Sequence, residues 1–142
     1  MWPFKKKNKS LFIRYHPDGR KPKRSTKYSA GHDLHANVRG SVKAGQRLMV
    51  PTGISWNHTV EDNWFGQIVE RSGNAVRYGI LTLGGIIDCD YDGEIMVILH
   101  NLGDQTFSFE KGDRIAQLLV LSYNSVEESG KVRAGGFGST GK

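Results

Sequence analysis

The sequence predicts an all-β domain, built as a barrel or a sandwich. Its apolar residues alternate with polar ones or form short blocks of about four to eight residues, the length of a strand. Glycine, aspartate and asparagine separate these blocks and mark turns. No segment keeps a helical period over about eleven residues. Many short strands at regular spacing are typical of β-sandwiches and barrels.

The expected strands follow one another along most of the chain. Each is rich in Leu, Ile, Val or Phe, and turn signals fall between them. The expected strands lie at residues 11–13, 48–50, 65–69, 80–83, 95–99 and 115–121. The turn signals between them lie at residues 17–19, 52–53, 84–85, 92–93, 102–104 and 111–113.

One short helix is expected between the third and fourth of these strands. Ser72 is the expected N-cap and Gly79 the C-terminal stop, with residues 74–77 between them. The free amides at the start of such a helix would make residues 71–73 a candidate anion site. A capped turn without any ligand would give the same pattern.

Length and composition favour a single domain without membrane contact. The chain has 142 residues, 37% of them hydrophobic, which suffices for one packed core. No stretch approaches the roughly 20 apolar residues of a membrane helix, and no secretion signal is evident. The one cysteine, Cys89, excludes an internal disulfide, so we expect an intracellular, reducing, cytoplasmic location.

The positive charge is concentrated at the N-terminus. Residues 1–27 hold ten Lys or Arg and one acid, whereas residues 28–142 carry a net charge of −3. We therefore expect a basic N-terminal arm over 1–27 that leads into the first strand, followed by the β-domain over 28–128. Such an arm contacts nucleic acid or phosphate weakly, or serves only as a solvated tail.

Residues 129–142 form a glycine-rich C-terminal segment with almost no core-forming side chains. It is either a plain tail or a flexible flap that closes over a ligand. In the second interpretation Phe137 stacks on the ligand, while backbone amides with Ser139 and Thr140 hold phosphate.

Five blocks, in order, resemble the motifs of the trimeric dUTPase family. They cover most of the chain from Ala30 to Gly141. The blocks are residues 30–34 (AGHDL), 71–73 with 79–80 (RSG and GI), 85–94 (GIIDCDYDGE), 112–117 (GDRIAQ) and 135–141 (GGFGSTG). The resemblance implies a jelly-roll subunit, with the short helix after the second motif, and a homotrimer with three active sites shared between subunits. It also implies Mg²⁺-dependent hydrolysis of dUTP to dUMP and pyrophosphate, which limits uracil incorporation into DNA and supplies dUMP.

The resemblance further implies a role for each motif residue. Asp88 matches the general base that orients water toward the α-phosphorus, and Asp33 matches the residue that holds a Mg²⁺-bound water. Residues matched to nucleoside contacts are Thr82, Ile86, Ile87, Tyr91, Met96 and Phe137. Residues matched to phosphate contacts are Arg71, Ser72, Gly73, Gln117, Arg133, Gly138, Ser139 and Thr140. Arg114 is expected to pair within the protein.

Some positions depart from the family pattern. His32 replaces an aromatic residue, Glu70 replaces a proline and is expected to pair with a nearby cation, and Thr82 stands where an asparagine side chain contacts uracil. Arg133 lies one residue closer than usual to Phe137. Two alternatives remain: a related dCTP deaminase, whose late glutamate is missing from the third block, and a nucleotide-controlled regulatory binding protein on the same fold.

Overall fold

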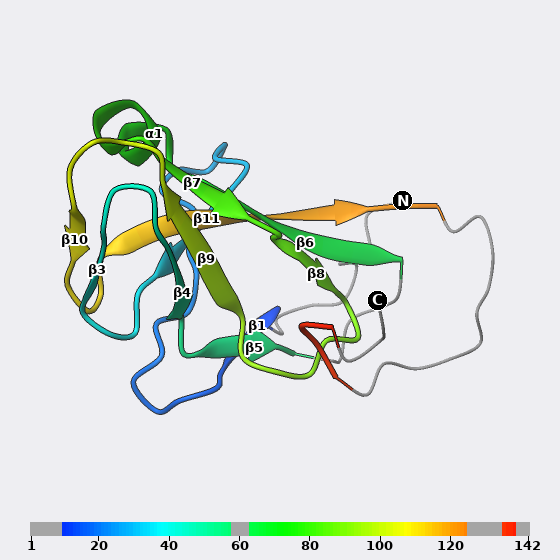
Figure 1. Cartoon of the computed structure of the whole chain (residues 1–142). Coiled ribbons are helices and arrows are strands. Elements are labelled where there is room, and N and C mark those ends of the chain that lie inside the picture. The colour runs from blue at the N-terminus through cyan, green and yellow to red at the C-terminus, as the bar shows by residue number, and fades with distance from the viewer. Residues whose placement is uncertain (1–9, 58–62, 125–134, 139–142) are drawn as a thin grey trace.

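The computed structural model describes residues 10–57, 63–124 and 135–138. Within them the chain forms eleven strands and one helix (Figure 1). The strands are β1 (Phe12–Arg14), β2 (His32–His35), β3 (Gly40–Val42), β4 (Arg47–Pro51), β5 (Ile54–Trp56), β6 (Trp64–Val69), β7 (Ile80–Leu83), β8 (Ile86–Asp88), β9 (Met96–Asn101), β10 (Phe107–Phe109) and β11 (Arg114–Ser122), and the helix is α1 (Ser72–Tyr78). All six predicted strands are present, and the all-β prediction is confirmed.

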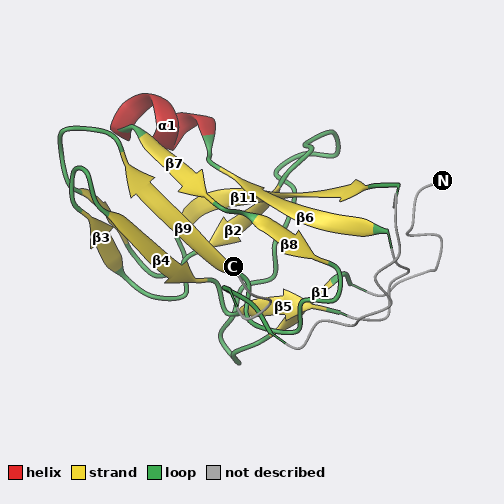
Figure 2. Ribbon diagram, turned by 45° about the vertical axis from the view of Figure 1, so that its right-hand side comes forward, coloured by secondary structure: helices red, strands yellow, loops and turns green. Residues whose placement is uncertain are grey.

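Two larger sheets make up most of the fold. One has the strand order β2-β11-β6-β8 and the other β4-β9-β7, while β1-β5 and β3-β10 form two-stranded ribbons. Every strand pair is antiparallel. Figure 2 shows the long strand β11 behind β6 and β8, with β4, β9 and β7 beside them. This is a jelly-roll-like β fold.

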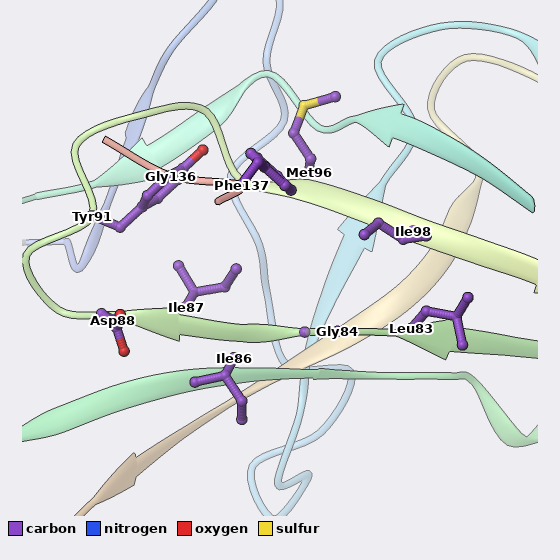
Figure 3. A pocket seen from close by; sticks show the side chains of 11 residues that line it. Leu83, Gly84, Ile86, Ile87, Asp88, Tyr91, Met96, Ile98, Gly136 and Phe137 are labelled. Atoms are coloured by element: carbon purple, nitrogen blue, oxygen red, sulfur yellow. The ribbon is translucent and has the colours of Figure 1, made fainter. Parts of the chain in front are cut away.

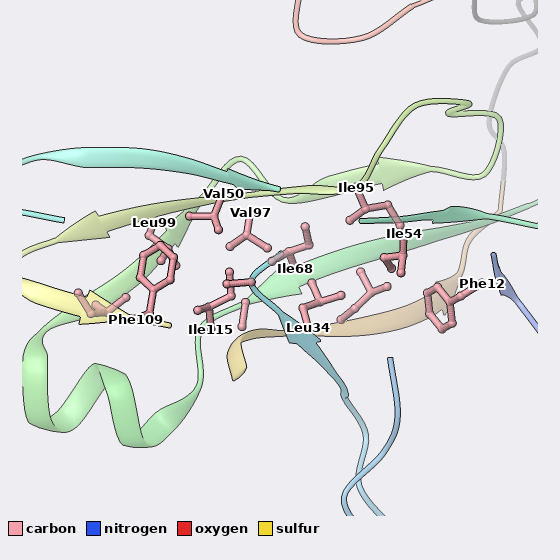
Figure 4. Packing of buried hydrophobic residues seen from close by; sticks show 14 of the residues in the cluster. Phe12, Leu34, Val50, Ile54, Ile68, Ile95, Val97, Leu99, Phe109 and Ile115 are labelled. Atoms are coloured by element: carbon pink, nitrogen blue, oxygen red, sulfur yellow. The ribbon is translucent and has the colours of Figure 1, made fainter. Parts of the chain in front are cut away.

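The core lies between the two larger sheets. Val50, Val97 and Leu99 of one sheet face Leu34, Ile68 and Ile115 of the other, and all six side chains are buried (Figure 4). Alternate residues of β6 and β9 are buried and half-exposed, as expected for strands with one face on the core. Burying such side chains is the main favourable term in folding.

One continuous segment passes from the first sheet to the second. β7 pairs with β9 as far as the Leu83–Ile98 pair, and β8 then pairs with β6. The change occurs at Gly84 and Gly85, whose φ angles are 64° and 92°. Glycine adopts this left-handed region without a steric penalty. Because the segment leaves β9 at this point, β8 and the start of β9, at Met96 and Val97, diverge and leave space between them.

Helix α1 begins one residue earlier than predicted. Arg71 occupies the N-cap position and makes no side-chain capping hydrogen bond, so the prediction of Ser72 as the N-cap was wrong. Gly79 ends the helix in the left-handed conformation, with φ 69°, as predicted. Within the described residues, no helix is long and apolar enough to cross a membrane.

Much of the predicted N-terminal arm is part of the fold. Phe12 is buried and stacks on Trp56, with ring centroids 5.5 Å apart, because β1 pairs with β5. Further along, Lys23 forms an antiparallel bridge to Asp33 of β2. Residues 10–24 therefore follow the β-domain closely, so that domain begins before residue 28.

A candidate nucleotide site

A pocket of about 300 Å³ opens where β8 and β9 diverge (Figure 3). This volume is at the lower end of the range for small-molecule sites, which is about 300–1,000 Å³. Most of its wall is apolar. The lining residues are Leu83, Gly84, Gly85, Ile86, Ile87, Asp88, Tyr91, Met96, Ile98, Gly136 and Phe137.

Six predicted site residues converge on this pocket. Ile86, Ile87 and Asp88 come from β8, Tyr91 from the following turn, Met96 from β9, and Phe137 from the C-terminal segment. Leu83 and Ile98 were not predicted. Ile98 lies two residues after Met96 on the same strand, and the strand period alone would have placed the two side chains on one face.

Asp88 lies at the end of β8, and its backbone is held in place. The Trp56 indole Nε1 donates a hydrogen bond to the Asp88 carbonyl oxygen at 3.0 Å, and the Tyr91 amide donates to the same oxygen at 3.1 Å. Trp56 is completely buried, so its indole is a fixed reference point for the strand end. These contacts hold Asp88, a half-exposed residue, among those that line the pocket.

The C-terminal segment lies against the turn that carries Tyr91. The Tyr91 hydroxyl donates a hydrogen bond to the Glu94 carbonyl oxygen at 2.8 Å, which fixes the ring. A Cβ atom on Gly136 would come within 2.8 Å of that ring, so only glycine fits so closely. Phe137 follows, two-thirds exposed, and forms an outer wall of the pocket.

A second cluster surrounds Asp33 on β2. Its carboxylate accepts a hydrogen bond from the Ser25 hydroxyl at 2.8 Å and lies 3.8 Å from Arg71 Nε and 3.6 Å from an Arg114 terminal nitrogen. Gln117 faces Asp33 across the β2–β11 ladder, and its side-chain amide donates to the Glu70 carbonyl oxygen at 3.0 Å. Arg114 thus pairs within the protein, as expected.

The two groups of predicted residues do not meet within one chain. Neither Asp33 nor the phosphate-matched Arg71, Ser72, Gly73 and Gln117 line the pocket. Asp88 lies opposite Phe65 near the start of β6, whereas Arg71 follows the end of that strand. At about 3.3 Å per residue, the six residues from Phe65 to Arg71 span roughly 20 Å.

Thr82 and Glu70 differ from their predicted roles. Thr82 does not line the pocket, because its hydroxyl is bonded to the Ile68 carbonyl oxygen at 3.3 Å and to the Glu70 carboxylate at 3.2 Å. The partner of Glu70 is therefore a hydroxyl and an amide of Thr82, not the expected cation. The backbone amide of Glu70 itself, and then these Thr82 donors, lower the pKa of the Glu70 carboxyl.

Several predicted residues receive no structural description. Arg133, Ser139 and Thr140 lie outside the described residues, as does most of the predicted flap over 129–142. Gly138 is described and has a φ of 96°, but it is not among the residues that line the pocket.

The residues present fit a magnesium ion only as a partner of a bound polyphosphate. Within the described ranges no group of three His, Cys, Asp or Glu side chains could hold a metal. Asp33 offers a single carboxylate, already shared with two arginines and a serine. Mg²⁺ keeps several waters and is commonly bound by one or two carboxylates together with substrate phosphates, which matches this donor set.

Known proteins resemble the chain over most of its length. Residues 18–141 match the dUTPase family. The deoxyuridine 5'-triphosphate nucleotidohydrolase of Candida glabrata is 42% identical, over 85% of this chain and 88% of that protein. The corresponding protein of Rickettsia felis is 45% identical, over 87% of this chain and 89% of that protein. The crystal structure of dUTPase from Streptococcus mutans superposes with a TM-score of 0.70 at 26% identity, over 84% of this chain and all of that one.

Proposed function

The chain belongs to the dUTPase family, and we propose that it hydrolyses dUTP to dUMP and pyrophosphate. The observation that carries this proposal is the pocket between β8 and β9, which joins an apolar, base-sized space to the carboxylate of Asp88. Nucleoside and reacting phosphate would thus bind side by side.

The uracil base binds against the backbone of β8. This strand is at the edge of its sheet and pairs with β6 on one side, so its other edge faces the pocket. The backbone groups of Ile86 and Ile87 are suited to hydrogen bonds with the polar edge of a pyrimidine. A close fit at this position would exclude the methyl group of thymine, because a packed wall cannot shift without cost.

The deoxyribose and the outer face of the base contact aromatic residues. The Tyr91 ring, held by its bond to Glu94, packs under the sugar and leaves no room for a 2′-hydroxyl. Phe137 stacks on the base, and Met96 flanks the sugar. Closure of this segment would exclude bulk water from the reacting phosphate.

Asp88 orients the attacking water. Its carboxylate accepts a hydrogen bond from the water, whose oxygen attacks the α-phosphorus as the proton moves to the carboxylate. The bond between the α-phosphorus and the α–β bridging oxygen breaks, and pyrophosphate leaves. The fixed backbone of Asp88 supports this role, because a general base needs a defined position.

The phosphates bind at the Asp33 cluster. The Arg71 guanidinium, amides of Ser72 and Gly73, and the Gln117 side chain hold phosphate oxygens, while Arg133, Gly138, Ser139 and Thr140 contribute from the C-terminal segment. Asp33 would hold a water of the bound Mg²⁺, which would neutralise charge on the phosphates. The same substrate would draw the Arg71 guanidinium partly away from Asp33. In the free chain, Arg71 Nε lies 3.8 Å from the Asp33 carboxylate.

Each site is shared between subunits of a homotrimer. The separation of roughly 20 Å along β6 is too long for one triphosphate to reach both Asp88 and Arg71 of the same chain. A neighbouring subunit that places its Asp33 cluster beside the pocket would complete the site.

Substrate discrimination tests this function. Pyrophosphate release is measured from dUTP, dTTP, UTP and dCTP, each with and without Mg²⁺. We expect Mg²⁺-dependent release from dUTP alone. Ammonia from dCTP would instead favour the related deaminase, and tight dUTP binding without turnover would favour the regulatory binding protein.

A further inference from the structure

The segment after β1 forms an exposed basic strip along one side of the β-domain. We define the basic strip as the six cationic side chains between residues 14 and 27, all of them exposed: Arg14, Arg20, Lys21, Lys23, Arg24 and Lys27. Buried residues in this stretch and just before it fix its backbone, namely Phe12, Gly19 and Pro22. In Figure 1 the blue segment leaves β1, forms a loop at the lower edge of the view and then runs upward.

The strip follows the edge strand of a sheet. β2 is the edge strand of its sheet, and Lys23 bridges to it at Asp33, where the Asp33 amide donates to the Lys23 carbonyl oxygen at 2.8 Å. At the other end Gly19 packs so closely on the Gly53 backbone that an added Cβ atom would come within 1.9 Å of a carbonyl oxygen. These two attachments, at Gly19 and Lys23, fix the backbone that carries the cations.

The charge of the strip is not balanced by the acids around it. Asp18 pairs with Lys111, and Asp33 pairs with Arg71 and Arg114. Among the described residues, no ion pair joins any cation of the strip to an acid. Two of the arginines make only neutral contacts: Arg14 donates to the Gly19 carbonyl oxygen, and Arg24 to that of Lys27.

Exposed aromatic rings accompany the cations. Tyr15 is 50% exposed next to Arg14, and Tyr28 is 87% exposed next to Lys27, whose ammonium lies 5.4 Å from the Tyr28 ring centroid. An exposed tyrosine at each end of a cationic row offers a stacking surface with no partner of its own in the core. Cationic grooves with exposed rings are the usual means of binding single-stranded nucleic acid.

We propose that the basic strip binds the phosphodiester backbone of single-stranded nucleic acid, with Tyr28 stacking on a base. Six exposed cations that form no ion pair among the described residues offer several contacts to the successive phosphates of one strand. Membrane binding is the weaker alternative, because the strip lacks the amphipathic helix and the apolar face that insert into a bilayer. The proposal does not depend on dUTP hydrolysis: the strip's side chains do not line the pocket, and Lys23 bonds to Asp33 through its backbone carbonyl, which the substitutions below keep.

The test uses the full chain, and substitutions rather than deletion, because removing residues 14–27 would also remove the Lys23 bridge to Asp33 and the packing of Gly19 on Gly53. The test variant combines Lys21→Gln, Lys23→Gln and Lys27→Gln. The matched control combines Arg39→Gln, Lys43→Gln and Arg47→Gln, which removes the same charge from exposed positions around β3 and β4. Binding of fluorescent oligo(dT) and oligo(U) of about 20 nucleotides, longer than the roughly 4–16 that one domain covers, is measured over a range of salt concentrations.

We expect the natural sequence to bind both oligonucleotides, with or without dUMP. In the test variant the slope of log affinity against log salt should fall by about 2, since each neutralised contact contributes about 0.7 on a single strand. Tyr28→Ala should weaken binding about fivefold or more without changing that slope. The control should bind like the natural sequence, and dUTP turnover should be unchanged in all variants.

Three outcomes would overturn the proposal. The first is an equal loss of binding in test and control variants, which would show a general charge effect. The second is an unchanged salt slope in the test variant. The third is binding to phosphatidylserine vesicles but not to either oligonucleotide, which would identify the surface as a membrane contact.

Discussion

At the scale of single residues, Phe137 is an aromatic side chain that contributes little to the core but much to the pocket. It is two-thirds exposed, yet it lines the site. We expect Phe137→Ala to weaken dUMP binding by about 1–3 kcal/mol, the contribution of a base–aromatic stack, with no loss of folding stability. Calorimetric titration measures the affinity. Tyr123→Ala, a half-exposed aromatic outside the pocket, is the control, and equal affinity in Phe137→Ala would exclude the stack.

His35 makes the stability of the fold sensitive to acid. Its side chain is buried on β2, and within the described residues its Nδ1 has no hydrogen-bond partner. Burial, and then the nearby Arg20, lower the pKa of His35. The unfolded chain therefore binds a proton at a higher pH than the native state does, and stability falls as the pH drops below about 6.5.

Urea unfolding between pH 8 and pH 5 measures this effect. The midpoint should be steady above about pH 6.5 and should decline below it. His35→Gln should lessen the decline, the rest of which is expected from His32, whose pKa burial also lowers. His16→Gln should not lessen it, because the His16 imidazole lies 3.5 Å from the Glu94 carboxylate, an attraction that acid would strengthen. If His35→Gln and the natural sequence had an identical pH dependence, His35 would not be a source of the acid sensitivity.

The resemblance to the dUTPase motifs predicted the pocket residues, both the neighbours Ile86, Ile87, Asp88 and Tyr91 and the distant Phe137. Thr82 was misplaced because its partners are Ile68 of β6 and Glu70, the residue that follows that strand. Such a hydrogen bond between distant segments leaves no periodic trace in the sequence.

At the scale of elements, the turn at Gly84 and Gly85 creates the pocket. Gly85 has a φ of 92°, and an added Cβ atom would come within 2.7 Å of the Ile68 carbonyl oxygen. Gly85→Ala therefore combines an unfavourable φ with a backbone clash. We expect a loss of about 2–4 kcal/mol in unfolding free energy, together with loss of dUMP binding.

Gly45→Ala separates the two effects of Gly85→Ala, because it has the unfavourable φ but not the backbone clash. Gly45 also has a positive φ, 78°, but an added Cβ atom would meet nothing within 4 Å. The Gly45→Ala variant should lose only about 1 kcal/mol of unfolding free energy and keep full dUMP binding. Urea unfolding gives both stabilities, and equal losses in the two variants would show that the close approach at Gly85 has no cost.

Element length explains which strands the sequence predicted. β4, β6, β9 and β11 carry five to nine residues with an evident apolar pattern, and all were predicted. β3, β5, β8 and β10 have only three residues each, too few to show a period of two; β1 is as short and was predicted from the continuous apolar run at 11–13. They form because neighbouring strands provide their hydrogen bonds, which is a property of the whole fold.

At the scale of the whole molecule, sites shared between subunits predict that two inactive variants restore activity when they assemble together. Asp88→Asn lacks the base, and Arg71→Ala lacks a phosphate contact, so each variant alone should be nearly inactive. If Asp88 and Arg71 of one site come from different subunits, mixed trimers contain sites with both natural residues. Co-expression in equal amounts should restore about a quarter of the natural activity.

Light scattering measures the oligomeric state on which that experiment depends. The assembly should have about three times the chain mass of 15.8 kDa. A mixture that is no more active than its separate components would place each site within one chain, and an active monomer would rule out shared sites altogether.

The role of Asp88 is the central claim, and pyrophosphate release from dUTP by Asp88→Asn tests it most directly. Asparagine keeps the shape of the side chain and cannot take the proton. We predict a loss of turnover of about a hundredfold or more, with dUMP affinity and urea stability close to those of the natural sequence. Turnover near the natural rate in a pure preparation of this variant would contradict the proposed mechanism.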